Sequence, residues 1–160
     1  MLVFDASSIM WAWDNYPLPQ FPGLWEWIDE QLSSGYICMP ETAFEEVNDK
    51  MPDCSQWLIE KNLSTIDINN EITQEAMFVK QLIGIVNDNY HPKGVDEKDL
   101  FIISTAKVFQ AELVSDEARQ PNLPQARPKY KIPAVCSLPD VNVVCTSFVE
   151  LIKRSNRVFR

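Results

Sequence analysis

Carboxylate side chains occupy the positions in this sequence where a parallel α/β fold would gather them. Asp5 ends a short apolar run near the N-terminus, and the pair Asp116 and Glu117 follows a second apolar run. Glu46 and Asp99 fall in the opening turns of two expected helices. The carboxyl ends of parallel strands and the first turns of the helices that follow them border the same crevice. We therefore expect these acids to converge.

Four converging carboxylates repel one another and raise each other's pKa unless a cation lies between them. Their hard oxygen atoms suit Mg²⁺ or Mn²⁺. Such ions activate water and stabilise the charge that develops on a phosphoryl oxygen. Asp5 is the strongest candidate, because an acid that ends a buried apolar run must be solvated, paired or bound to a metal. The residue types thus indicate metal-assisted hydrolysis of a phosphodiester.

Several of these acids also have a local structural role to weigh against ligation. Asp96 is a good N-cap for the helix that carries Asp99, and Asp99 itself is favourable in a first helical turn. Thr42 and Glu45 match a capping box, which would leave the next residue free to point at the crevice. Asp116 could serve as a turn residue, so the fourth metal ligand is either this residue or its neighbour.

Cysteine, histidine and glycine usage excludes several other kinds of site. The four cysteines contain no C-x-x-C pair and do not have the spacing of a zinc site. His91 is the only histidine, so a catalytic triad or a multi-histidine metal site would depend on it alone. Neither G-x-G-x-x-G nor G-x-x-x-x-G-K-[ST] occurs, which argues against a nucleotide-binding loop.

Charge is distributed unevenly along the chain, whose net charge is −9. Residues 1–118 hold 21 acids and 6 bases, whereas residues 119–160 hold 2 acids and 8 bases. An acidic body would bind cations, and the adjoining basic segment would bind a phosphate chain. We therefore take Arg119, Arg127, Lys129 and Lys131 as candidate substrate-binding residues. The alternative is a solvated loop whose bases only balance the acidic body.

The hydrophobic pattern predicts strands that alternate with helices. Strands are expected at 2–4, 36–39, 63–68, 112–115 and 141–145, and helices at 6–13, 23–34, 42–50, 53–62, 71–86, after 96, and at 148–153. This order favours a mainly parallel sheet with helices on both faces. No apolar run approaches the ~20 residues of a membrane helix. The N-terminus lacks the basic region of a secretory signal, so we expect a cytoplasmic protein without a membrane partner.

The acidic positions resemble those of the PIN-domain family, metal-dependent nucleases that include VapC-type toxin ribonucleases. Its first motif, a strand ending in Asp with a small polar residue two positions later, matches F-D-A-S. The second and third motifs match A-F-E-E-V and D-L-F-I-I-S-T-A, and the fourth matches V-S-D-E. The residues that these matches identify are Asp5, Ser7, Glu46, Asp99, Ser115 and Glu117, with Asp116 adjacent.

Two further segments resemble a bacterial PIN-like subfamily. One is the Pro-rich pattern Y-P…F-P-G-x-W, which runs from Tyr16 to Trp25. The other is K-I-P-x-x-C, from Lys131 to Cys136, which is followed later by F-x-x-L. Together with the acidic motifs, these segments extend the resemblance over nearly the whole chain.

The resemblance implies a single PIN-like domain over residues 1–160, folded as a three-layer α/β/α sandwich. It also implies an endoribonuclease that cuts RNA through Mg²⁺ or Mn²⁺ held by Asp5, Glu46, Asp99 and one of Asp116 and Glu117. Ser7 and Ser115 would support these ligands. An antitoxin protein and a second copy of the chain are the possible protein partners.

Two alternatives remain open. One is a catalytically degenerate PIN-like binding module, against which the filled acidic positions argue. The other is a haloacid-dehalogenase-type phosphatase, which would require an acid where Ser7 stands.

Overall fold

The computed structural model describes residues 1–160, and its strands and helices alternate as the sequence predicts. The strands are β1 (Leu2–Phe4), β2 (Ile37–Pro40), β3 (Ser64–Ile66), β4 (Glu112–Val114) and β5 (Cys145–Thr146). The helices are α1 (Ala6–Asn15), α2 (Pro22–Ser33), α3 (Glu41–Lys50), α4 (Pro52–Glu60), α5 (Asn70–Leu82), α6 (Glu97–Val108), α7 (Ile132–Cys136) and α8 (Phe148–Ser155), with a 3-10 turn η1 (Arg127–Lys129).

All five strands belong to one parallel sheet, in the order β3-β2-β1-β4-β5. Leu2 in β1 pairs with Ile37 on one side and with Glu112 on the other. Every residue of β1 and β2 is buried, as expected for parallel strands that are covered on both faces. The strand order reverses between β1 and β4, so the sheet has its topological switch point there. The predicted α/β class is confirmed.

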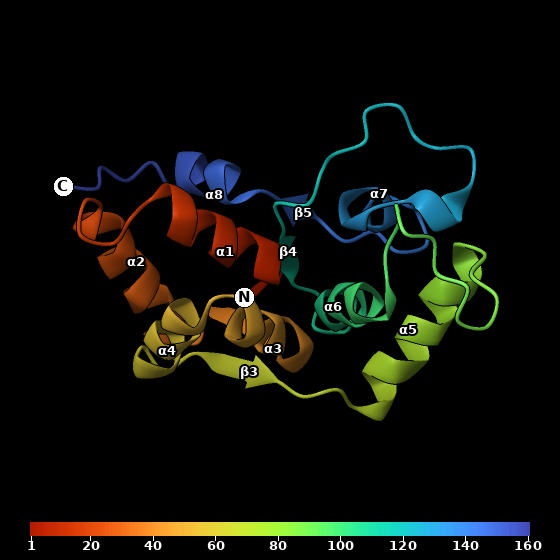
Figure 1. Ribbon diagram of the computed structural model, residues 1–160, viewed down its shortest axis with the longest axis horizontal. Helices are drawn as coiled ribbons and strands as arrows, with labels where there is room; N and C mark the ends of the chain where they lie inside the picture. Colours follow the sequence, from red (N-terminus) through yellow and green to blue (C-terminus); the bar gives the residue numbers. More distant parts are fainter.

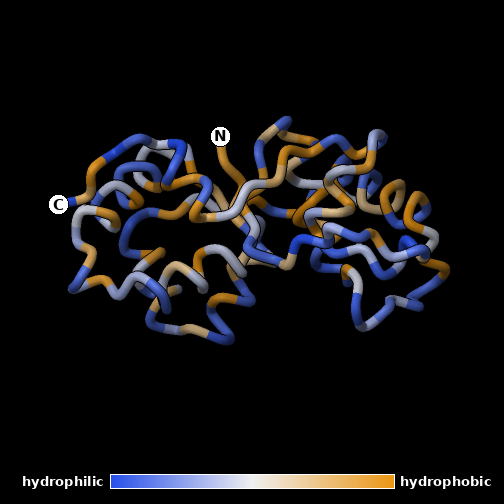
Figure 2. Tube along the Cα trace, turned by 90° about the horizontal axis from the view of Figure 1, so that it is seen from above, coloured by the Kyte–Doolittle hydropathy of each residue, from blue (hydrophilic) through white to orange (hydrophobic).

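Helices cover the sheet on both sides. Helix α6 packs against β1, β2 and β4, and α5 packs on the outer side of α6. Figure 1 shows α5, α6 and α7 on one side of β4 and α1, α2 and α8 on the other. Figure 2 shows the N-terminal strand running between these two groups of helices, with many of the peripheral turns hydrophilic. No helix combines the length and the apolar character that crossing a membrane requires.

The Pro-rich segment after α1 fastens the N-terminal helices to each other. The Trp25 indole N–H donates to the carbonyl oxygen of Tyr16 at 2.7 Å, and the Tyr16 and Phe21 rings meet edge to face. Gly23 faces the C-terminal backbone so closely that a Cβ there would lie 2.6 Å from the carbonyl oxygen of Arg160. The motif from Tyr16 to Trp25 is therefore explained by packing.

Two local predictions were wrong. Helix α3 begins at Glu41, and its N-cap is Pro40, so the expected capping box of Thr42 and Glu45 does not form. The Thr42 hydroxyl is instead buried without a hydrogen-bond partner. The last strand starts at Cys145 rather than at residue 141, because the backbone N–H groups of residues 141 and 142 both donate to the carbonyl of Leu138. These two residues thus continue the turn that follows α7 and do not join the sheet.

Candidate metal and phosphodiester site

A pocket of about 440 Å³ lies at the carboxyl ends of β1 and β4, where the strand order reverses. In α/β folds this is the place where ligands bind. Four of the predicted acids line it, namely Asp5, Glu46, Asp99 and Glu117. Its other lining residues are Ser7, Met10, Asp49, Lys50, Asp96 and Lys98. The tertiary structure therefore gathers four carboxylates from four separate segments of the chain.

Asp5 is the buried centre of this pocket. Only 3% of its surface is exposed. The hydroxyls of Ser7 and Ser115 donate to the same carboxylate oxygen, Oδ2, at 2.6 and 2.9 Å. The second oxygen, Oδ1, accepts no hydrogen bond and is available to a ligand. Burial raises the pKa of Asp5 to about 6, although the two hydroxyls lower it, and the charges of Glu117 and Glu46 raise it further.

The same serines position the loop that follows β4. The Asp116 N–H donates to the Ser7 hydroxyl at 3.0 Å, and the Glu117 N–H donates to the Ser115 hydroxyl at 3.3 Å. The side chain of Asp116 turns to α8 instead, where its Oδ2 accepts the Phe148 N–H at 3.1 Å. Asp116 does not line the pocket, whereas Glu117 does. The structure thus places Glu117, and not Asp116, in the pocket, a choice that the sequence did not decide.

A reciprocal capping box fixes Asp99 at the start of α6. The Asp96 carboxylate accepts the Asp99 N–H at 2.9 Å, and Asp99 Oδ2 accepts the Asp96 N–H at 2.9 Å. Burial is the main cause that raises the pKa of Asp99 to about 8, with further contributions from the charges of Asp96, Asp5 and Glu117. The N-cap prediction for Asp96 is confirmed, and the cap also orients its neighbour's carboxylate at the pocket.

Sequence reasoning did not identify Lys50, Lys98 and Asp49 as residues of this pocket. Lys50, at the end of α3, places its Nζ 2.5 Å from Glu46 Oε1. Lys98, in the first turn of α6, also lines the pocket. The spacing of Lys50 from Glu46 is i,i+4, which puts both on one helix face and could have been read from the sequence.

The donor chemistry of the pocket fits a hard divalent cation. All of its acidic groups offer oxygen ligands, and the raised pKa values of Asp5 and Asp99 show that their negative charges are incompletely compensated. As the side chains stand, no group of three His, Cys, Asp or Glu residues is close enough to hold a metal ion. Mg²⁺ commonly binds through one or two carboxylates and keeps several waters, so direct ligation by all four acids is not required.

The predicted substrate-binding bases do not line this pocket. The Arg119 guanidinium donates to the backbone carbonyls of Ser115 and Glu117 at 2.6 and 3.0 Å and so supports the loop that carries them. Arg127 donates to the carbonyl of Leu82, at the end of α5. Lys129 and Lys131 bracket the end of η1 and the start of α7 without forming an ion pair.

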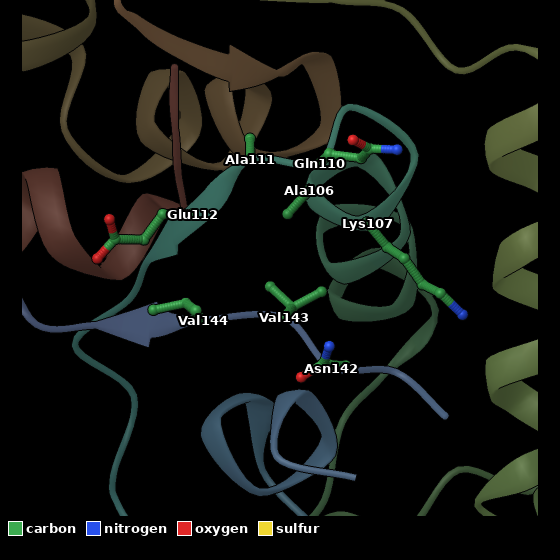
Figure 3. A pocket seen from close by; sticks show the side chains of 8 residues that line it. All are labelled: Ala106, Lys107, Gln110, Ala111, Glu112, Asn142, Val143 and Val144. Carbon is green, nitrogen blue, oxygen red and sulfur yellow. The ribbon is translucent and has the colours of Figure 1, made fainter. Parts of the chain in front are cut away.

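A second hollow, of about 450 Å³, lies at the amino end of β4 and shares no lining residue with the pocket that contains Asp5. Figure 3 shows the side chains of Lys107 and Glu112 pointing in opposite directions out of it. Both side chains form ion pairs with other residues, Lys107 with Glu75 and Glu112 with Arg154. The hollow lacks the convergent polar groups of a catalytic site.

Comparisons with known proteins agree with this architecture. A family model described as "Domain of unknown function (DUF4411)" matches residues 2–159. The chain is also similar to a solved structure described as "Crystal structure of VapBC2 from Rickettsia felis bound to a DNA fragment from their promoter". That match has 16% identity and a TM-score of 0.55, and it covers 92% of this chain and 98% of the other. The likeness shows a shared PIN-like fold. No curated protein matches the chain.

Proposed function

The chain belongs to the DUF4411 family, and we propose that it is a divalent-cation-dependent ribonuclease that hydrolyses RNA phosphodiester bonds. One observation carries the proposal. Asp5, buried and held by two serines, shares a pocket at the switch point of the sheet with Glu46, Asp99 and Glu117. The choice of RNA as substrate comes from the resemblance of these acidic motifs to those of PIN-domain nucleases.

Each protein group in the pocket has a definite task in such a reaction. A bound Mg²⁺ or Mn²⁺ supplies an activated water and stabilises charge on the phosphoryl oxygen. Ser7 and Ser115 fix one oxygen of Asp5, so the other oxygen would be the one that holds the cation. The capping box holds Asp99 in a single orientation, so little side-chain entropy is lost when a ligand binds. The lysines at the rim offset the charge of the phosphate chain.

The decisive experiment compares cleavage of labelled RNA by the purified protein in Mn²⁺, in Mg²⁺ and in excess EDTA. We expect cleavage only with a divalent cation, and its loss in Asp5→Asn, which keeps the shape of the side chain but removes its charge. Asp53→Asn, an exposed acid in the first turn of α4, is the matched control. Circular dichroism should show both variants folded. Equal cleavage in EDTA would exclude the proposed mechanism, and RNA binding without cleavage would indicate a binding module.

The resemblance to VapC-type nucleases extends the proposal to a toxin that pairs with an antitoxin protein. The similar solved structure is of VapBC2, bound to a DNA fragment from its promoter. We expect expression of the wild-type chain to arrest growth and expression of Asp5→Asn to be tolerated. Co-expression with the protein encoded by a small adjacent reading frame should relieve the arrest. Light scattering on the purified chain would test the expected homodimer.

A further inference from the structure

Lys50 holds the carboxylate that a cation would need. Its Nζ lies 2.5 Å from Glu46 Oε1, while 62% of the Lys50 side chain and 30% of the Glu46 side chain are exposed. Lys98, the other lysine of the pocket, forms no ion pair. Lys50 is therefore the lysine of this pocket that forms an ion pair with one of its acids.

This ion pair contributes little to the fold. Exposed i,i+4 pairs between Glu and Lys stabilise helices only weakly. Helix α3 is anchored by Ala43 and Val47, which are fully buried. An exposed lysine on a flexible four-carbon stem can change rotamer at small cost, and its ammonium is a compact charge that suits a phosphate oxygen. The position of Lys50 thus matters for the pocket and not for the stability of the helix.

We propose that Lys50 is a phosphate-binding residue that is released by the cation. In the cation-free pocket its ammonium neutralises Glu46. When a divalent cation takes Glu46, the two positive charges repel, and the ammonium moves to a phosphate of the RNA. This inference rests on the proposed ribonuclease function, and it adds an order of events in which the cation binds first and the substrate phosphate is gripped second.

The first test measures Mn²⁺ binding by isothermal titration calorimetry for the wild type, Lys50→Met and Lys98→Met. Methionine keeps most of the apolar stem and removes the charge. If Lys50 competes for Glu46, Lys50→Met binds Mn²⁺ about twofold to fivefold more tightly, the range that an exposed ion pair supports. Lys98→Met removes the same charge from the same pocket without breaking an ion pair, so it should change the affinity less. Equal effects of the two variants would overturn the competition.

The second test measures the affinity of a phosphorothioate RNA oligonucleotide, which resists cleavage, by fluorescence anisotropy with and without Mn²⁺. We expect Lys50→Met to weaken RNA binding only when Mn²⁺ is present, and to reduce the salt slope there by about one phosphate contact. A purely structural role for Lys50 would not depend on the cation. Unchanged RNA affinity in Mn²⁺ would overturn the phosphate-binding role.

The two proposals fail in different ways. If neither the wild type nor Lys50→Met binds Mn²⁺, the ribonuclease proposal falls together with this one. If the wild type binds Mn²⁺ and cleaves RNA while Lys50→Met matches it in both affinities, only the role of Lys50 is refuted.

Discussion

Replacing Asp5 with Asn should stabilise the folded protein at neutral pH when no divalent cation is present. Burial raises the pKa of the Asp5 carboxyl from 3.8 to about 6, which means that the folded state disfavours the charged form. A rise of that size corresponds to about 3 kcal/mol of free energy at a pH where the group is ionised in both states. Asparagine carries no charge, and its side-chain oxygen can still accept the hydroxyls of Ser7 and Ser115. We therefore expect a gain of up to ~3 kcal/mol.

The pH dependence follows from the sign of this shift. Between pH 3.8 and about 6 the folded state binds more protons at Asp5 than the unfolded state does. The contribution of Asp5 to stability is therefore present below the unfolded pKa and is lost as the pH rises through the folded pKa. The advantage of Asp5→Asn should be near zero at about pH 3 and should reach its full size above about pH 7.

Urea unfolding in EDTA at a series of pH values, followed by tryptophan fluorescence, measures this difference. Adding Mn²⁺ at 1,000 times its Kd should reverse the order, because that excess stabilises the wild type by about 4.1 kcal/mol and the variant lacks the charge that binds the cation. Asp53→Asn changes an exposed acid, so its stability should match that of the wild type both in EDTA and in Mn²⁺. An Asp5→Asn variant that is less stable than the wild type in EDTA at pH 7 would refute the idea that Asp5 is a destabilising charge held for function.

Three further predictions concern the serine contacts of Asp5, the packing at Gly94 and the basic C-terminal segment. Ser115→Ala removes one of the two hydroxyls that lower the pKa of Asp5, so the acidic limb of the pH–rate profile for RNA cleavage should move to higher pH. Gly94→Ala should unfold the chain or cost several kcal/mol in urea denaturation, roughly as overpacking does, because a Cβ there would lie 1.9 Å from a backbone carbonyl oxygen of the facing 3-10 turn. Alanine at both Lys129 and Lys131 should lower RNA affinity and flatten its salt slope by roughly one per lost contact; an unchanged slope would assign both lysines to solubility or to a partner surface.

Local sequence signals predicted the alternating elements and the acids at their ends. Apolar runs bounded by charge or proline identify buried strands because a parallel sheet hides both faces. Asp5 was identifiable for the same reason, since a carboxylate next to such a run has to be compensated. The N-cap at Asp96 was likewise predictable, because capping depends on residues within one helical turn.

Local signals failed where a competing neighbour decided the structure. Thr42 has the right spacing for a capping box with Glu45, yet the strand before it runs directly into a helix that starts one residue earlier. The substrate-binding role of the basic C-terminal segment stays a prediction. Its sequence did not indicate that Arg119 and Arg127 donate to backbone carbonyls, because the acceptor of Arg127 lies 45 residues away in the sequence.

The sequence by itself indicated that Asp5, Glu46 and Asp99 lie at the crevice of the sheet, because strand ends and helix starts are set by short-range patterns. Only the tertiary structure decided which of two adjacent acids faces the pocket. Asp116 is drawn to the free N–H of Phe148 at the start of α8, and Glu117 is left to face Asp5. That choice depends on where a helix 32 residues later begins, which no local pattern contains. The distances that give Asp5 a pKa of about 6 are set in the same way, by packing between segments that are remote in the chain.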